Sequence, residues 1–150
     1  MGGIMKSKLL DETNGRCTYV VVFEVGDDVN AGLLDFATEK RLEAGHFTAI
    51  GGFRDVVLGY YDWDGKKIVR NQIAEQVEVV SLIGNFARSP EGNPQFHAHV
   101  AVARRDGSMC GGHLLEAHAR PTVEVVVTES PAHLQRTYDQ QTGMSVIRLG

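Results

Sequence analysis

Three of the chain's six histidines, at positions 97, 99 and 113, lie on either side of one short turn. Side chains alternate between the two faces of a β-strand, so His97 and His99 project from the same face. Two imidazoles in this arrangement can bind one metal ion, because neither side chain has to bend around the backbone. Whether His113 joins them depends on the length of the turn.

The turn before His113 contains an Asp-Gly pair at positions 106 and 107. A plain two-residue turn would pair His113 with Val100, and the third imidazole would then lie on the opposite face. A three-residue loop over positions 105–107, with its glycine in the left-handed conformation, pairs His113 with His99 instead.

A second arrangement also brings the third histidine to the shared face. A two-residue turn followed by a β-bulge at Gly111 and Gly112 would place His113 opposite Ala101. Both arrangements use glycines that the sequence supplies. Three neutral nitrogens with an open fourth position resemble catalytic zinc sites more than closed structural ones.

Few other side chains have a spacing that suits this centre. Glu75 and Glu78 precede a predicted strand, and either is a candidate base or hydrogen-bonding partner of the ligands. Cys110 lies at an odd offset from His113, so strand alternation turns its thiol away, and we leave it out of the ligand set.

Apolar periodicity predicts the elements that carry these residues. Residues 27–45 read as the one helix, with Asp27 or Asp28 as its N-cap and Gly45 at its end. Alternating or continuous apolar runs predict the strands. The tail predicts a short helical turn and a last strand. The predicted strands include residues 17–25, 47–53, 55–63, 66–71, 75–87 and 122–129. One helix among about seven strands predicts a single compact α+β domain with a mainly antiparallel sheet.

The composition limits the classes of function. A formal net charge of −4 and a pI near 5.8 give little attraction for the phosphates of a nucleic acid. Two distant cysteines, Cys17 and Cys110, indicate a reducing compartment. No apolar run is long enough to span a membrane, and a signal peptide is not recognisable, so we expect a cytoplasmic protein.

Several segments together resemble the PPC domain, also called DUF296, of plants and prokaryotes. They are EVVSLIGNFA (78–87), FHAHVAVARRDGSMCGGHLLEA (96–117), TVEVVVTE (122–129) and AIGGFRDVVLGYYD (49–62). The resemblance covers about residues 16–130. It makes residues 16–150 the domain, and residues 1–15 an extension or first strand.

The resemblance implies an antiparallel α+β subunit that assembles as a homotrimer. It also implies a metal, zinc or another divalent transition metal, bound at His97, His99 and His113. DNA association comes with the family, although this chain lacks the AT-hook that enters the minor groove in the plant proteins. The sequence predicts a metal-binding protein, and the alternative is a zinc-dependent lyase, decarboxylase or hydrolase acting on a small oxygenated acid.

Overall fold

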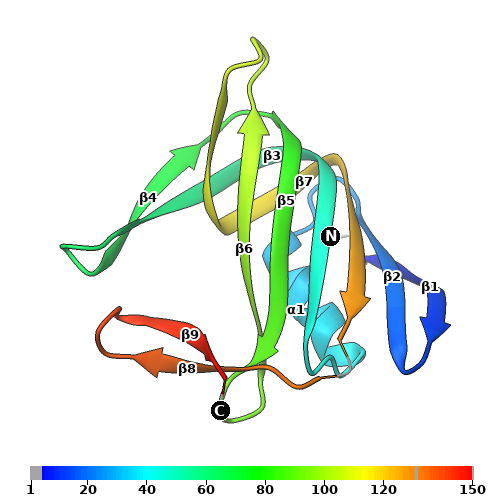
Figure 1. The fold of residues 1–150 in the computed structure, drawn as a ribbon. Coiled ribbons are helices and arrows are strands. Elements are labelled where there is room, and N and C mark those ends of the chain that lie inside the picture. The colour runs from blue at the N-terminus through cyan, green and yellow to red at the C-terminus, as the bar shows by residue number, and fades with distance from the viewer. Residues whose placement is uncertain (1–4, 131, 150) are drawn as a thin grey trace.

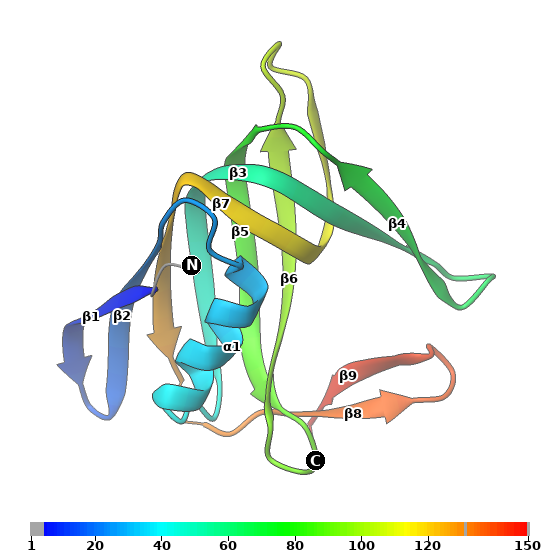
Figure 2. The ribbon, with the colours of Figure 1, turned by 180° about the vertical axis from the view of Figure 1, so that it is seen from behind.

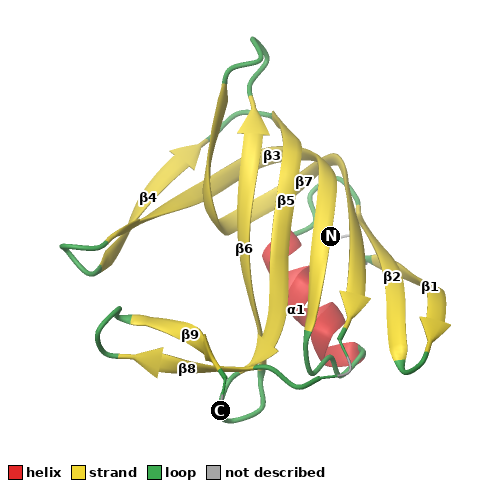
Figure 3. Cartoon of the chain, viewed as in Figure 1, coloured by secondary structure: helices red, strands yellow, loops and turns green. Residues whose placement is uncertain are grey.

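The computed structural model describes residues 5–130 and 132–149, so the first four residues of the predicted N-terminal region lie outside the described part. These residues form one nine-stranded sheet with a single helix, α1 (Val29–Glu39) (Figures 1 and 3). The strands are β1 (Lys6–Thr13), β2 (Arg16–Phe23), β3 (Gly45–Asp62), β4 (Lys67–Ile73), β5 (Val77–Arg88), β6 (Pro94–Ala103), β7 (Met109–Glu129), β8 (Gln135–Asp139) and β9 (Met144–Arg148). The single compact domain is confirmed.

The predicted mainly antiparallel sheet of about seven strands is corrected in two respects. It has nine strands, and it is mixed, because β8 pairs with β5 in parallel through Gln135 and Arg88. The predicted helical turn in the tail is also wrong: β8 and β9 form a hairpin. Its turn is stabilised by the Asp139 carboxylate, which accepts a hydrogen bond from the Gln141 amide at 2.7 Å.

Four strands close on themselves. β3 pairs with β5, β5 with β6, β6 with β7, and β7 again with β3, all antiparallel. This circuit removes free edges from the middle of the sheet. β2 and β4 extend it on either side by pairing with β7 and β3 (Figure 1). The β6–β7 hairpin is thereby held on both sides, which fixes the orientation of the side chains that it carries.

Two strands run through positions that the sequence marks as breaks. The predicted strands 47–53 and 55–63 form one strand, β3, and β7 continues through Pro121. Their ladder skips residues 120–122, so the missing N–H of Pro121 is not needed there. Gly51 has a φ of 144°, and a Cβ there would lie 2.2 Å from the Thr122 carbonyl oxygen. Glycine therefore allows the two strands to bend together.

The helix begins as predicted and ends earlier. Asp28 is the N-cap, and its carboxylate accepts a hydrogen bond from the Ala31 amide at 2.9 Å. The predicted end at Gly45 is wrong, since that residue begins β3. The helix ends in a Schellman motif: Arg41 has a φ of 53°, and the amide of Leu42 donates to the Ala37 carbonyl at 3.0 Å.

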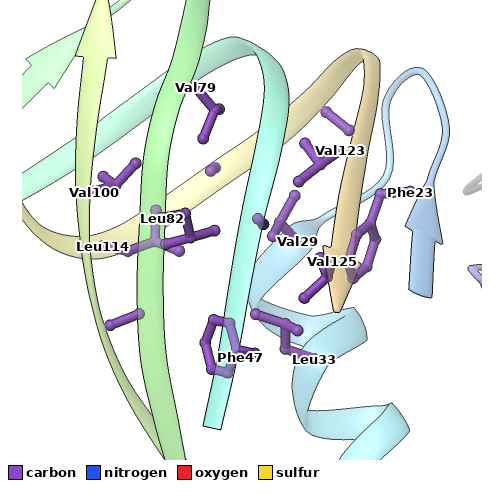
Figure 4. Packing of buried hydrophobic residues seen from close by; sticks show 14 of the residues in the cluster. Phe23, Val29, Leu33, Phe47, Val79, Leu82, Val100, Leu114, Val123 and Val125 are labelled. Atoms are coloured by element: carbon purple, nitrogen blue, oxygen red, sulfur yellow. The ribbon is translucent and has the colours of Figure 1, made fainter. Parts of the chain in front are cut away.

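The core lies between α1 and the inner face of the sheet. In Figure 2, which views the molecule from behind, α1 lies across the strands. Figure 4 shows Val29 and Leu33 of α1 beside Phe47 and Val125 of the sheet. All four are buried. A fully buried side chain of this kind contributes about 1.5–3 kcal/mol, so the core provides a rigid support for the opposite face of the sheet. Within the described residues, no helix is long and apolar enough to cross a membrane.

Candidate metal centre

The turn between β6 and β7 has the three-residue loop that the sequence allows. Gly107 has a φ of 83°, and the Arg104 amide donates to the Ser108 carbonyl at 2.9 Å. The carboxylate of Asp106 accepts hydrogen bonds from the amide of Ser108 at 2.9 Å and from its hydroxyl at 2.6 Å. The resulting register pairs His113 with His99, which confirms this arrangement.

The alternative bulge at Gly111 and Gly112 is wrong, because both residues pair regularly with β6. Glycine is needed at these two positions for a different reason, which is close packing. A Cβ at Gly112 would lie 2.5 Å from the Gly59 carbonyl oxygen, and one at Gly111 would lie 2.6 Å from the Val100 carbonyl oxygen. Such contacts are too short, so glycine lets β7 fit closely between β3 and β6 at the strand position next to His113.

The strand alternation that the sequence predicts is confirmed along β6. Ala98, Val100 and Val102 are buried in the core, and His97 and His99 face away from it. This division follows from the two-residue period of a strand, because the core fixes one face and leaves the other free.

The three imidazoles converge. Nε2 of His97 lies 2.9 Å from Nδ1 of His113, and Nε2 of His99 lies 3.1 Å from the same atom. One ligand nitrogen from each ring lies within 4.8 Å of the others. The ring centroids are 4.9 Å apart for His97 and His113, and 4.3 Å apart for His99 and His113.

This geometry fits a metal ion better than a hydrogen-bond network. Nδ1 of an imidazole has either one N–H or one lone pair, so that atom of His113 can make only one good hydrogen bond. Two ring nitrogens nevertheless approach it closely. Tetrahedral zinc with bonds of about 2.0–2.1 Å separates its ligand nitrogens by roughly 3.3–3.4 Å. Shifts of a few tenths of an ångström would accommodate an ion.

Two of the rings are held in the form that binds metals. Partial burial of the His97 ring lowers its pKa to about 4, and the nearby charges of His113, Arg136 and His99 act in the same direction. Partial burial also lowers the pKa of His113, and His99 contributes. Metals bind neutral imidazole, so at neutral pH these rings offer lone pairs rather than protons.

The two predicted carboxylates lie elsewhere. Glu75 accepts a hydrogen bond from Nε of Arg104 at 3.0 Å, and Glu78 pairs with Ala103. Both line a depression of about 590 Å³ with Arg104 and Arg105. Ala103 is four residues beyond His99 on β6, roughly 13 Å along a strand. In this position neither carboxylate belongs to the histidine cluster.

Two histidines outside the cluster lie close to carboxylates. His118 Nδ1 lies 2.7 Å from an Asp55 carboxylate oxygen, and His133 Nδ1 lies 3.1 Å from Glu43. Partial burial acts to raise the pKa of Asp55, but the hydrogen bonds from His118 and Arg54 outweigh it and lower the pKa. These histidines therefore serve ion pairs outside the cluster.

A cavity of about 650 Å³ adjoins the histidines. His97 and His113 form part of its wall, together with Asn85 of β5 and Arg136 of β8. Most of the remaining wall is apolar: Leu34, Ile68, Phe96, Leu115, Met144, Val146 and Ile147. Sequence reasoning missed Arg136, because it lies in the tail, where no motif or spacing connects it with the hairpin.

A closed β-sheet circuit with one helix and three converging histidines defines a class of small β-domains with a candidate metal centre. Residues 10–131 match the model of the Plants and Prokaryotes Conserved (PCC) domain, and the chain belongs to this family. The match includes β6 and the three histidines.

Solved structures share the fold. The metal-containing protein AF0104 from Archaeoglobus fulgidus is 30% identical, with a TM-score of 0.82 over 98% of this chain and 99% of that one. A "putative DNA binding protein" from Bacteroides thetaiotaomicron is 25% identical, with a TM-score of 0.87 over 97% of this chain and 98% of that one. A plant- and prokaryote-conserved protein from Pyrococcus horikoshii, 23% identical, has a TM-score of 0.81 over 97% and 96% of the two chains.

One curated relative is much longer. The bifunctional protein GlmU from Synechococcus sp. (strain JA-3-3Ab) is 30% identical over 126 residues. The match covers 79% of this chain and 18% of that protein. The similarity therefore concerns one segment of the longer protein.

Proposed function

We propose that this chain is a metal-binding protein whose centre is formed by His97, His99 and His113. The observation that carries the proposal is the convergence of three ring nitrogens within 4.8 Å on one hairpin. The 30% identical structure from Archaeoglobus fulgidus, described as a metal-containing protein, supports it. Imidazole nitrogens suit zinc among several transition metals, and a three-histidine set with space beside it suits zinc with an exchangeable position.

Elemental analysis of the purified protein tests the proposal. We expect about one zinc per chain, since one three-histidine cluster provides one site. The His97→Ala, His99→Ala double variant should lose it, because one remaining imidazole cannot hold the ion. The matched control is His118→Ala, His133→Ala, which also removes two histidines but leaves the cluster intact. Equal metal in both double variants would refute the assignment.

We propose a homotrimer, and an exposed apolar patch on the sheet supports it. Ile50 of β3, Val80 and Ile83 of β5, and Val126 of β7 are all exposed. Thr48 pairs with Ile83 and Val126, so these strands present one continuous face. Exposed apolar residues that lie together indicate a contact with another molecule.

The substitution Ile50→Glu should dissociate this assembly, because it places a charge where Ile50 is 60% exposed on the patch. Light scattering should report three 16.4-kDa chains for the wild type and a single chain for the variant. Val69→Glu on β4, where the residue is 40% exposed, is the control and should stay trimeric. A wild-type monomer would contradict the proposal.

DNA association stays a prediction of the family resemblance. The protein carries a net charge of −4, and several of its basic side chains are already in ion pairs with carboxylates, which weakens their attraction for a phosphate backbone. Such pairs include Arg54 with Asp55, Arg88 with Glu43, and Arg104 with Glu75. We also propose a cytoplasmic location, since Cys17 and Cys110 are both free thiols.

A zinc-dependent enzyme acting on a small oxygenated acid is the second candidate. The cavity that includes His97 and His113 favours it, because a ligand could occupy space beside the metal. A zinc ion with an exchangeable position would supply Lewis acidity toward an oxygen atom.

A further inference from the structure

Arg136 is a buried cation in the wall of the cavity beside the histidines. The residue is 6% exposed, although arginine is among the residues that are seldom buried without a charged partner. It lies on β8 of the tail hairpin, which Figure 1 shows beside the lower end of β6.

The partners of Arg136 are neutral. One terminal nitrogen donates to the amide oxygen of Asn85, and the other lies 3.5 Å from the Ser145 carbonyl oxygen. Its Nε is buried and has no hydrogen-bond partner among the residues that the structure describes. Among these described residues, no carboxylate lies within ion-pair distance of the Arg136 guanidinium. Arg148 on the same hairpin, by contrast, pairs with Asp139.

A guanidinium in this position requires an anion. Removing a full charge from water costs several kcal/mol, and an arginine cannot avoid the cost by releasing its proton. Burial lowers the pKa of Arg136, in agreement with a loss of hydration that no anion offsets. Carboxylates match the planar guanidinium through two parallel hydrogen bonds, and each terminal nitrogen has a second N–H besides the one that its neutral partner accepts.

The position of Arg136 connects it to the histidines. Its partner Asn85 pairs directly with His97 across β5 and β6. Arg136, His97 and His113 line the same cavity. A divalent ion at the histidines would add a second positive centre to this wall, so the cavity would favour anions by charge.

The remaining wall selects for an apolar group. Phe96, Leu115 and Ile147 are among its lining residues, and its volume of about 650 Å³ lies in the range of small-molecule sites. A short aliphatic chain is therefore the part of a ligand that this surface would bind.

We propose that the cavity binds a small carboxylic acid with an apolar chain and a further oxygen atom. The carboxylate pairs with Arg136, the chain lies against the apolar wall, and the second oxygen points to the histidines. The last element rests on the proposed metal centre. The carboxylate contact does not, because Arg136 carries its charge without any metal.

Isothermal titration of the full chain tests the proposal with 2-hydroxy-4-methylpentanoate and the corresponding amide, which differ in charge. We expect the zinc-loaded protein to bind the acid at least about tenfold more tightly than the amide. Arg136→Gln should weaken acid binding by about 10- to 100-fold and leave the zinc content unchanged. Arg148→Gln, the matched control, replaces an exposed and paired arginine of the same hairpin and should bind like the wild type.

The outcomes separate this proposal from the metal centre. Equal binding of acid and amide to the wild type, or no binding of either, overturns it whether or not the variants fold. The proposal is also overturned if Arg136→Gln folds and still prefers the acid over the amide, or if a carboxylate from a second copy of this chain pairs with Arg136. If the wild-type protein binds no zinc but still prefers the acid, the metal centre alone is refuted, because the Arg136 contact does not depend on the metal.

Discussion

Stripping the bound metal should lower the midpoint of thermal unfolding by about 8–16 °C. A ligand that binds only the folded state stabilises it by about 4.1 kcal/mol at a free concentration of roughly 1,000 times its Kd. In a domain near 150 residues, each kcal/mol shifts the midpoint by about 2–4 °C. Calorimetry with excess zinc, and again after chelation, measures the difference.

The same calorimetric comparison, with zinc and after chelation, in histidine variants tests which side chains hold the stabilising metal. His99→Ala removes a proposed ligand that faces away from the core, so the variant should fold without the metal and lose most of the chelation effect. His118→Ala should retain the full effect, because that ring contacts Asp55 instead. An undiminished shift in His99→Ala would place the stabilising metal elsewhere.

Replacing Phe86 by alanine should destabilise the fold by about 3–5 kcal/mol. Phe86 is 1% exposed, and its ring centroid lies 5.0 Å from that of Phe47 and 6.3 Å from that of Phe96. Truncation removes buried apolar surface and leaves a cavity between strands that cannot collapse freely. Urea denaturation measures the loss, which is a large share of the 5–15 kcal/mol typical of whole domains.

Tyr138→Ala is the matched control, since it also removes an aromatic ring. Tyr138 is 68% exposed, so we expect a change within about 0.5 kcal/mol. A similar loss in both variants would mean that the three-phenylalanine cluster is not a principal support of the hairpin that carries His97.

The histidine cluster could be predicted because its geometry is local. The two-residue period of a strand places His97 and His99 together, and the loop length together with any bulge after it decides the face of His113. The sequence left two loop arrangements open. The left-handed Gly107 and the regular pairing of Gly111 and Gly112 decide between them.

Longer-range features could not be predicted in this way. Pro121 and Arg54 lie at the limits of predicted strands, yet β7 and β3 continue through them and bend around each other. The chain just after α1 is another example, because Arg41 adopts the left-handed conformation without being a glycine, while Leu42 is buried in the core. In each case tertiary packing outweighs the local preference.

The sequence by itself determined the β-rich class, the single helix with its N-cap at Asp27 or Asp28, and the set of three imidazoles. These depend on periodicity and capping, which act over a few residues. Only the tertiary structure decided that the sheet closes on itself and that Arg136 lies beside His97 with no carboxylate partner among the residues that the structure describes. Contacts between β5, β6 and β8 set that arrangement, and no local pattern encodes which distant segments will pack together.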